Sequence, residues 1–248
     1  NERKFRLMKL ILPMAGNGQR FFDDGYDLPK PLIDIKGKPM FVRVIENLHL
    51  GDDVRPWCII RQDHVDDYEI DKRILEYYPE AHIIITPGTT EGAACTVRLA
   101  ANVLGDEPMM VANCDQLMDW NHEKFYEMAK QEIYPGGLIP VFMPNHNEPK
   151  HSYVDVDAYD RLLLLREKEI ISNLATVGVY YFGNESKWIK AHEQQMKQND
   201  RTNNEFYLAP TYNYIQESVG IYRVDKMIGM GTPEAVSYTH LTLPTNSS

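Results

Sequence analysis

The sequence predicts a single α/β domain in which helices cover both faces of a mainly parallel sheet. Short β-rich apolar runs alternate with longer segments of helical period, and this repetition favours parallel strand pairing. The 248 residues, 43% of them hydrophobic, suffice for one large domain with a substantial core. Two ordinary enzyme domains with a linker would need a longer chain.

The regular part of the pattern lies in the first half of the chain. The predicted strands are residues 10–13, 57–60, 82–86, 109–112 and 138–142. The predicted helices are residues 40–48, 65–78, 91–103 and 122–131. Ligands of such sheets bind at the carboxyl ends of the strands, so the loops after Leu12 and Ala112 are the expected site.

The pattern loosens after about residue 145. Residues 153–156 and 161–165 predict a hairpin, 175–182 a long strand and 185–198 a polar helix, which together extend the same domain. We expect the domain to span 8–235. Residues 1–7 and 236–248 are expected to be non-native or disordered, and the tail from Val236 resembles translated sequencing-adapter DNA.

Charge, hydrophobicity and cysteine spacing limit the classes of molecule that this chain is expected to bind. The net charge is −10, yet nine basic and five acidic residues lie between Asn1 and Arg43. A small basic region in an acidic protein suits a nucleoside triphosphate better than a nucleic acid. No apolar run reaches the roughly 20 residues that cross a bilayer, so no membrane partner is expected. Cys58, Cys95 and Cys114 form no C-x-x-C pair and indicate buried thiols in a reducing cytoplasm.

A glycine-rich loop follows the first predicted strand. In Gly16-Asn17-Gly18-Gln19-Arg20-Phe21, small residues let backbone N–H groups approach phosphate oxygens. A dinucleotide-binding fingerprint needs a third small residue where Phe21 stands. A P-loop needs Ser or Thr after Gly-Lys, but Pro39 follows Gly37-Lys38. Both interpretations are therefore excluded.

Two cations accompany this loop. Arg20 lies within it, and Lys30 stands between Pro29 and Pro31, which restrict the backbone on both sides. A catalyst that joins two phosphate-bearing substrates needs cations aimed at the triphosphate and at the departing pyrophosphate. Arg20 and Lys30 suit that task, although both could also be surface charges in a turn-rich loop.

The segment from Leu12 to Phe21, followed by Pro29-Lys30-Pro31-Leu32, resembles the signature of the sugar-phosphate nucleotidyltransferases, the family that includes glucose-1-phosphate thymidylyltransferase. Further family elements have counterparts along most of the chain. They are Gly92-Ala93-Ala94, Asn113-Cys114-Asp115, Glu167-Lys168, Ser172-Asn173, Gly178-Val179-Tyr180, Glu205-Phe206-Tyr207-Leu208 and Gly231-Thr232-Pro233-Glu234.

The resemblance implies a Rossmann-like nucleotide-diphospho-sugar transferase fold, with a mainly parallel mixed sheet flanked by helices. It makes Arg20 and Lys30 the catalytic residues. The implied nucleotide-binding residues are Met14, Ala15, Gly16, Asn17, Gly18, Gly92 and Ala93. The implied acceptor-binding residues, within roughly residues 145–225, are Glu167, Lys168, Asn173, Gly178 and Glu205.

Asp115 is the predicted metal ligand. It follows an apolar strand within three residues, and Mg²⁺ is usually held by one or two carboxylates together with substrate phosphates. An Asp that caps the turn is the structural alternative. The family commonly supplies a second Asp where this chain has Gly229, and Asp225 cannot be assumed to replace it. His146 and His151 lack the spacing of a helical metal pair and receive no role.

The expected function is transfer of a nucleotidyl group to a sugar phosphate, with Mg²⁺, giving a nucleotide sugar for capsule or surface-polysaccharide synthesis and releasing pyrophosphate. A cytidylyltransferase acting on a non-sugar phosphate such as phosphocholine is one alternative. A GT-A-type glycosyltransferase is another, although Asn113 stands where an Asp-x-Asp pair would begin. A non-catalytic binding module is the third. The sequence specifies neither the base of the nucleotide nor whether the protein forms a homo-oligomer.

Overall fold

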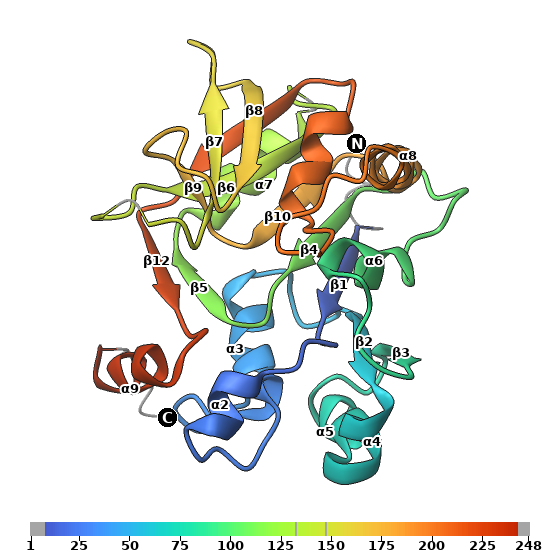
Figure 1. The fold of residues 1–248 in the computed structure, drawn as a ribbon, viewed down its shortest axis with the longest axis vertical. Coiled ribbons are helices and arrows are strands. Elements are labelled where there is room, and N and C mark those ends of the chain that lie inside the picture. Colours follow the sequence, from blue (N-terminus) through green and yellow to red (C-terminus); the bar gives the residue numbers. More distant parts are fainter. Residues whose placement is uncertain (1–7, 132, 147, 243–248) are drawn as a thin grey trace.

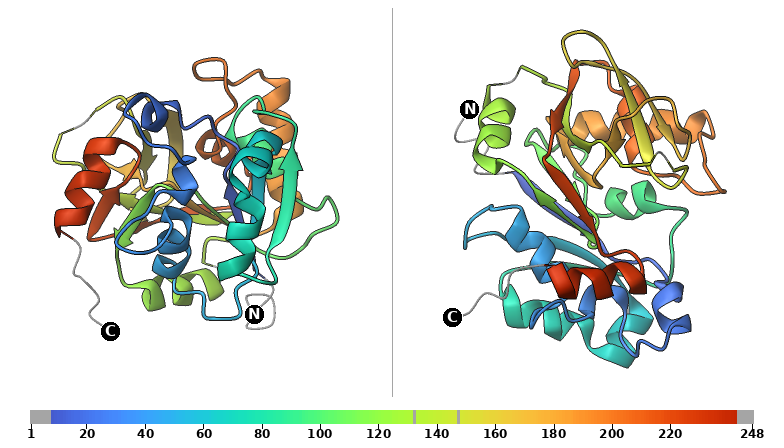
Figure 2. Two further views of the ribbon diagram at one scale, coloured as in Figure 1. Left: turned by 90° about the horizontal axis from the view of Figure 1, so that it is seen from below. Right: turned by 90° about the vertical axis from the view of Figure 1, so that its left-hand side faces the viewer.

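The computed structural model describes residues 8–131, 133–146 and 148–242, so 1–7 and 243–248 of the expected non-native ends lie outside the described residues. The described chain forms a ten-stranded mixed sheet flanked by helices and a separate two-stranded sheet (Figures 1 and 2). The strand order of the large sheet is β3-β2-β1-β4-β10-β6-β9-β7-β8, with β11 beside β6. The predicted α/β fold class is confirmed.

The first four strands of the chain are parallel neighbours. They are β1 (Lys9–Pro13), β2 (Trp57–Arg61), β3 (His82–Thr86) and β4 (Met109–Ala112). In β1, Leu10 and Leu12 join the hydrophobic cluster on one face of the sheet, and Ile11 joins the cluster on the other. Because both faces of β1, β2 and β4 are covered, these strands are continuous apolar runs rather than alternating patterns, whereas the edge strand β3 is partly exposed.

Helices connect and cover these strands. They are α2 (Gln19–Asp23), α3 (Met40–Asn47), α4 (Gln62–Tyr68), α5 (Ile70–Tyr77), α6 (Ala93–Arg98), α7 (His122–Lys130), α8 (Glu185–Lys197) and α9 (Pro233–Thr242), with the 3-10 helices η1 (Lys30–Leu32) and η2 (Ala209–Tyr214). The single helix predicted at 65–78 is two helices. Glu69 adopts a left-handed conformation, with φ of 51°, and separates α4 from α5. The helix predicted at 91–103 is also shorter, because Gly92 has a φ of 133° and α6 begins after it.

The second half of the large sheet is mostly antiparallel. Its strands are β6 (Gly137–Phe142), β7 (Ser152–Val156), β8 (Leu162–Glu167), β9 (Ala175–Thr176), β10 (Val179–Phe182) and β11 (Val219–Arg223). The predicted strand at 175–182 is interrupted at Gly178, whose φ is 94°. A Cβ there would lie 2.0 Å from the Gln116 side-chain nitrogen, so only glycine fits this close approach.

Sequence patterns did not predict the two-stranded sheet, in which β5 (Gln116–Asp119) pairs with β12 (Lys226–Gly229). This pairing brings the segment after β12 to the metal-ligand candidate, where the Met230 amide donates to the Asp115 carbonyl at 2.7 Å. Residues 236–242 lie in α9, which begins at Pro233. The Val236 side chain is buried in the same cluster as Phe21.

Candidate active site

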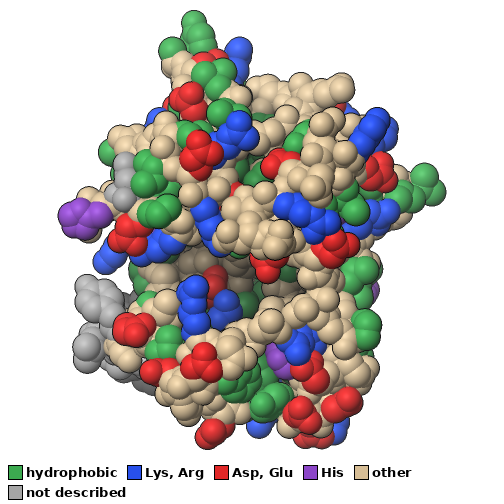
Figure 3. Space-filling model, in the orientation of Figure 1, with side chains coloured by type: hydrophobic (Ala, Val, Ile, Leu, Met, Phe, Trp, Pro, Cys, Tyr) green, Lys and Arg blue, Asp and Glu red, His purple; other side chains and the backbone are tan. Residues whose placement is uncertain are grey.

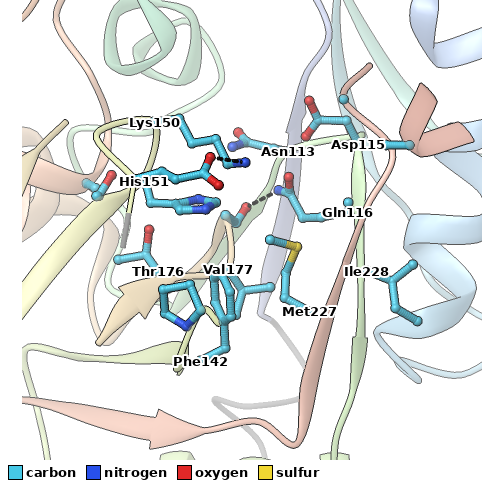
Figure 4. A pocket seen from close by; sticks show the side chains of 18 of the residues that line it. Asn113, Asp115, Gln116, Phe142, Lys150, His151, Thr176, Val177, Met227 and Ile228 are labelled. Atoms are coloured by element: carbon cyan, nitrogen blue, oxygen red, sulfur yellow. Dashed lines mark hydrogen bonds and ion pairs between the residues drawn. The ribbon is translucent and has the colours of Figure 1, made fainter. Parts of the chain in front are cut away.

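A cavity of about 860 Å³ opens between the carboxyl ends of the parallel strands and the antiparallel half of the sheet. The space-filling view shows a hollow on this face, with Lys and Arg side chains at its edge (Figure 3). Figure 4 shows the lining side chains from close by. Of the residues predicted from the sequence, Arg20, Ala93, Asp115, Glu167, Lys168 and Gly178 line this cavity.

Lys30 and Asp115 form an ion pair beside the cavity. The Lys30 amine donates to a carboxylate oxygen of Asp115 at 2.7 Å, although the two residues are 85 positions apart. Lys30 begins η1, and Asp115 follows β4. Burial opposes the charged amine, but the Asp115 carboxylate and its hydrogen bond outweigh that effect and raise the pKa of Lys30. Lys30 is therefore a permanently charged donor at neutral pH.

The glycine loop continues from the carboxyl end of β1. Met14 and Ala15 are buried, and the Met14 amide donates to the Ile59 carbonyl at 2.8 Å. Gly16 and Asn17 are exposed. Gly18 adopts a left-handed conformation, with φ of 60°, directly before α2. None of the loop residues from Met14 to Gly18 lines the cavity itself, but Arg20 in α2 does.

Gly18 also packs against Lys30. A Cβ at Gly18 would lie 3.5 Å from the Lys30 Cβ, so the glycine loop lies directly against the lysine. The Asn17 side-chain oxygen accepts a hydrogen bond from Arg61, the last residue of the neighbouring strand β2. The loop predicted to approach phosphate and the predicted catalytic lysine are therefore neighbours in space.

Gly92 is a second position that only glycine can occupy. A Cβ there would lie 2.5 Å from the Phe206 carbonyl oxygen. The Phe206 amide donates to the Glu91 carbonyl at 2.8 Å, and its carbonyl accepts from the Ala94 amide at 3.1 Å. The loop predicted to bind the nucleotide is thus hydrogen-bonded to the segment that carries Tyr207.

Glu167 and Lys168 lie at the end of β8 and line the cavity. Ser152 donates its hydroxyl hydrogen to Glu167, and burial raises the pKa of this carboxyl group. Lys168 has a φ of 57°, which is unusual for a residue with a side chain. Its amine donates to the Tyr207 hydroxyl at 2.6 Å and lies 4.7 Å from the centre of that ring.

Two predicted acceptor residues are not brought to the cavity. Asn173 and Glu205 are both exposed, and neither lines it. The backbone around Glu205 forms a tight bridge with Thr202, which directs this region to the surface. Their proposed contact with the acceptor receives no support from the geometry.

Sequence reasoning missed several cavity residues, among them His146, His151, Gln116 and Tyr207. The two histidines were judged only by metal-ligand spacing. The predicted hairpin offered better evidence for a role of His151. In the structure Ser152 pairs with Glu167 across this hairpin, which places His151 opposite Lys168. Burial lowers the pKa of His151, whose ring meets Phe142 edge to face at 5.3 Å between centroids.

The fold and the cavity define the class of this protein as a Rossmann-like α/β fold with a cavity at the carboxyl ends of its parallel strands. A family model described as nucleotidyl transferase matches residues 9–220, and the chain belongs to this family. The family resemblance seen in the sequence is therefore confirmed.

Similarity to individual proteins extends over most of the chain. It is 25% identical over 198 residues to a mannose-1-phosphate guanyltransferase of Hypocrea jecorina, a match that covers 71% of this chain and 49% of that protein. The chain thus spans about half the length of this curated relative. A nucleoside-diphosphate-sugar pyrophosphorylase from Vibrio cholerae RC9 has the same fold, with a TM-score of 0.80 at 19% identity over 94% of this chain and 100% of that one.

An inositol-1-phosphate CTP transferase from T. maritima also shares the fold, with a TM-score of 0.67 at 14% identity over 96% of this chain and 97% of that one.

Within the described residues, no helix is both long and apolar enough to span a bilayer. Cys58, Cys95 and Cys114 are free thiols. Cys58 and Cys114 are buried as predicted, whereas Cys95 is only half-buried.

Proposed function

We propose that this chain joins a nucleoside triphosphate to a sugar phosphate, giving a nucleotide sugar and pyrophosphate. The observation that carries the proposal is the Lys30–Asp115 pair, which lies where the glycine loop meets the cavity. Family membership supports it, as does the similarity to a mannose-1-phosphate guanyltransferase. The same cavity contains a second group of polar residues, Glu167 and Lys168, suited to a separate acceptor.

The proposed reaction is an in-line displacement. An oxygen of the acceptor phosphate attacks the α-phosphorus, and a new P–O bond forms. The bond from the α-phosphorus to the bridging oxygen breaks, and pyrophosphate leaves with the electron pair. Arg20 and Lys30 stabilise the negative charge, while Lys168 holds the acceptor phosphate and Glu167 accepts a hydrogen bond from the acceptor. No covalent enzyme intermediate is needed.

Mg²⁺ is the proposed cofactor, with Asp115 as its protein ligand. Among the described residues, no group of three His, Cys, Asp or Glu side chains could hold a metal. Gly229 lies opposite Gln116 in the two-stranded sheet, and Asp225 lies near its other end, hydrogen-bonded to Asp119. One carboxylate completed by substrate phosphates fits Mg²⁺, which would offset phosphate charge when bound.

The proposal extends to the setting of the reaction. We place the enzyme in a reducing cytoplasm, in the synthesis of capsule or other surface polysaccharides, with no nucleic-acid partner. The free thiols and the acidic net charge of −10 support this setting. A homo-oligomer is compatible with it.

A substrate matrix tests the proposal. The protein is incubated with Mg²⁺, each of the common nucleoside triphosphates and a panel of sugar 1-phosphates, and pyrophosphate release is measured. We expect release with at least one pair and a roughly 100- to 1,000-fold lower kcat/KM for Lys30→Ala. Lys38→Ala is the control, because Lys38 pairs with Glu46 on the surface. No pyrophosphate from any pair, or an unchanged rate for Lys30→Ala, contradicts the assignment.

A further inference from the structure

We propose that His192 is a positioning residue for the proposed nucleotidyl transfer, acting on the cavity through Gln195 and Tyr207. This inference rests on the proposed function and adds to it two residues, His192 and Gln195, that do not line the cavity. The observation behind it is a chain of hydrogen bonds that runs from a buried histidine in α8 to the cavity.

The chain begins inside the protein. His192 and Gln195 lie one turn apart in α8 and are 1% and 0% exposed. Polar side chains buried to this degree are normally hydrogen-bonded. The His192 Nδ1 and the Gln195 Oε1 lie 3.0 Å apart, and the Gln195 side-chain nitrogen donates to the Tyr207 carbonyl at 2.8 Å. The buried side of α8 is therefore joined to the segment that borders the cavity.

The Tyr207 carbonyl fixes the direction of these hydrogen bonds. A carbonyl only accepts, so the Gln195 amide presents its nitrogen to Tyr207 and its oxygen to His192. The Nδ1 of His192 therefore carries the ring proton and donates it to the Gln195 oxygen. Among the described residues the His192 Nε2 has no partner, and in this form the ring has no unpaired N–H. Burial lowers the pKa of His192, which keeps the ring neutral at pH 7.

The imidazole ring is held on two sides by aromatic neighbours. Trp188 stacks on it, with 5.5 Å between the ring centroids and 8° between the planes, and Phe206 meets it edge to face at 6.3 Å. The Trp188 ring nitrogen donates to the Thr211 hydroxyl at 3.1 Å, and that hydroxyl donates to the Leu208 carbonyl at 2.6 Å. The backbone of residues 206–208 is thus held to α8 by two separate chains of hydrogen bonds.

The other end of the chain lies in the cavity, where Tyr207 is a lining residue. Its hydroxyl accepts from the Lys168 amine at 2.6 Å, so a displaced Tyr207 backbone displaces the amine proposed to hold the acceptor phosphate. Without a donor at His192, the buried Gln195 oxygen would be unpaired, which is costly. The amide would then turn toward another donor and release the Tyr207 carbonyl. His192 in this way positions Lys168 without touching either substrate.

Nitrogen-15 NMR of the histidine side chains tests the direction of the hydrogen bonds without any turnover. The spectrum of the wild type at pH 7 is compared with that of His192→Asn, which assigns the His192 signals. We expect a neutral ring with its proton on Nδ1. A proton on Nε2 alone would overturn the inference, because Nδ1 could not then donate to Gln195.

Two substitutions at His192 test its effect on the cavity. His192→Phe keeps a ring against Trp188 but has no donor, whereas His192→Asn retains an N–H close to the position of Nδ1. With the substrates that the wild type uses, the acceptor KM should rise about three- to tenfold in His192→Phe at little changed kcat, the effect of about one hydrogen bond. It should stay near the wild-type value in His192→Asn. Gln195→Leu should behave as His192→Phe does.

Gln194→Leu is the matched control for Gln195→Leu, because Gln194 is exposed on the same helix and does not line the cavity. Thermal unfolding identifies any variant that does not fold, and if His192→Phe is one, Gln195→Leu decides the matter. An unchanged acceptor KM in the folded variants overturns the inference. Equal rises in His192→Phe and His192→Asn also overturn it, since they would reflect packing alone. If the wild type releases no pyrophosphate with any substrate pair, the proposed function itself fails, and the inference fails with it.

Discussion

Lys30 and Asp115 show what single residues disclose in a sequence. Lys30 was identified by its two flanking prolines and Asp115 by its position after a strand, so each was predicted separately. Nothing in the sequence indicated that they form an ion pair at 2.7 Å, since contact between residues 85 positions apart depends on the strand order. The sequence thus singled out Lys30 and Asp115 as charged candidates, but it did not predict that the two side chains form an ion pair.

The contact between Tyr207 and Lys168 carries a prediction at this scale. Tyr207→Phe removes the hydroxyl that accepts from the Lys168 amine, so the amine loses its fixed position. We expect the KM for the acceptor to rise several-fold, while the KM for the nucleotide stays unchanged; steady-state kinetics measure both. Tyr214→Phe is the control, because the Tyr214 hydroxyl contacts Asp200 away from the cavity. A loss confined to kcat would contradict the positioning role.

Glu167 gives a prediction about pH. Burial raises the pKa of Glu167 above its ordinary value of 4.5, so between these two pKa values the folded state binds more protons than the unfolded state. The free energy of unfolding should then fall as pH rises from about 4.5 through the raised pKa, and the contribution of Glu167 should be fully present only below 4.5. Glu167→Gln should remove this pH dependence, as urea unfolding at pH 4 to 8 would show. Parallel pH profiles of the two proteins would contradict it.

At the scale of elements, the long periodic segments were predicted and the interruptions were not. The strands at 82–86 and 109–112 match the structure, because uninterrupted apolar runs define them. The breaks at Glu69 and Gly178 arise from left-handed backbone conformations, which the hydrophobic period does not encode. The strands β5 and β12 are four residues each, and they are stabilised by pairing with each other across a long sequence separation.

Gly92 provides a prediction for the loop before α6. An alanine there would have a φ of 133° and a Cβ 2.5 Å from the Phe206 carbonyl oxygen. Gly92→Ala should therefore lower the free energy of unfolding by about 1–3 kcal/mol and weaken nucleotide binding. Urea unfolding and nucleotide titration measure the two effects. Gly88→Ala is the matched control, since nothing lies within 4 Å of a Cβ there. Equal stability of the two variants would refute this account.

For the molecule as a whole, the class of fold was predictable and the joining of its two halves was not. The alternation of strands and helices in the sequence predicts a parallel sheet with helices on both faces. The insertion of β10 between β4 and β6, antiparallel to both, has no local signal. The cavity depends on that insertion, because Gly178 before β10 accommodates the Gln116 side chain beside Asp115. Arg20 and Asp115, which are proposed to act on phosphate and metal, were therefore predicted from the sequence and line the cavity, whereas most of the cavity residues from the antiparallel half were not predicted.

A partly buried ion pair joins distant parts of the whole fold. Lys9 at the start of β1 contacts Glu185 at the start of α8, and their side chains are 15% and 2% exposed. Glu185→Ala would leave the Lys9 charge without its partner and should lower the free energy of unfolding by about 3–5 kcal/mol. The exposed Lys187–Glu217 pair is the comparison, where Lys187→Ala should cost less than about 1 kcal/mol. Urea unfolding would measure both, and similar losses would contradict the expectation.

The hydrogen bonds that join Phe206 to Glu91 and Ala94 have a thermodynamic consequence. Phe206 contacts the loop at Gly92, and its neighbour Tyr207 contacts Lys168, the residue proposed to hold the acceptor phosphate. Under the proposed function, a ligand that shifted one of these two residues would alter the energy of placing the other, and the two ligand affinities would then be linked. By linkage, whatever factor a bound nucleotide imposes on acceptor affinity, a bound acceptor must impose equally on the nucleotide. Under the proposed function, Phe206 and Tyr207 would therefore couple the binding of the nucleotide to the binding of the acceptor.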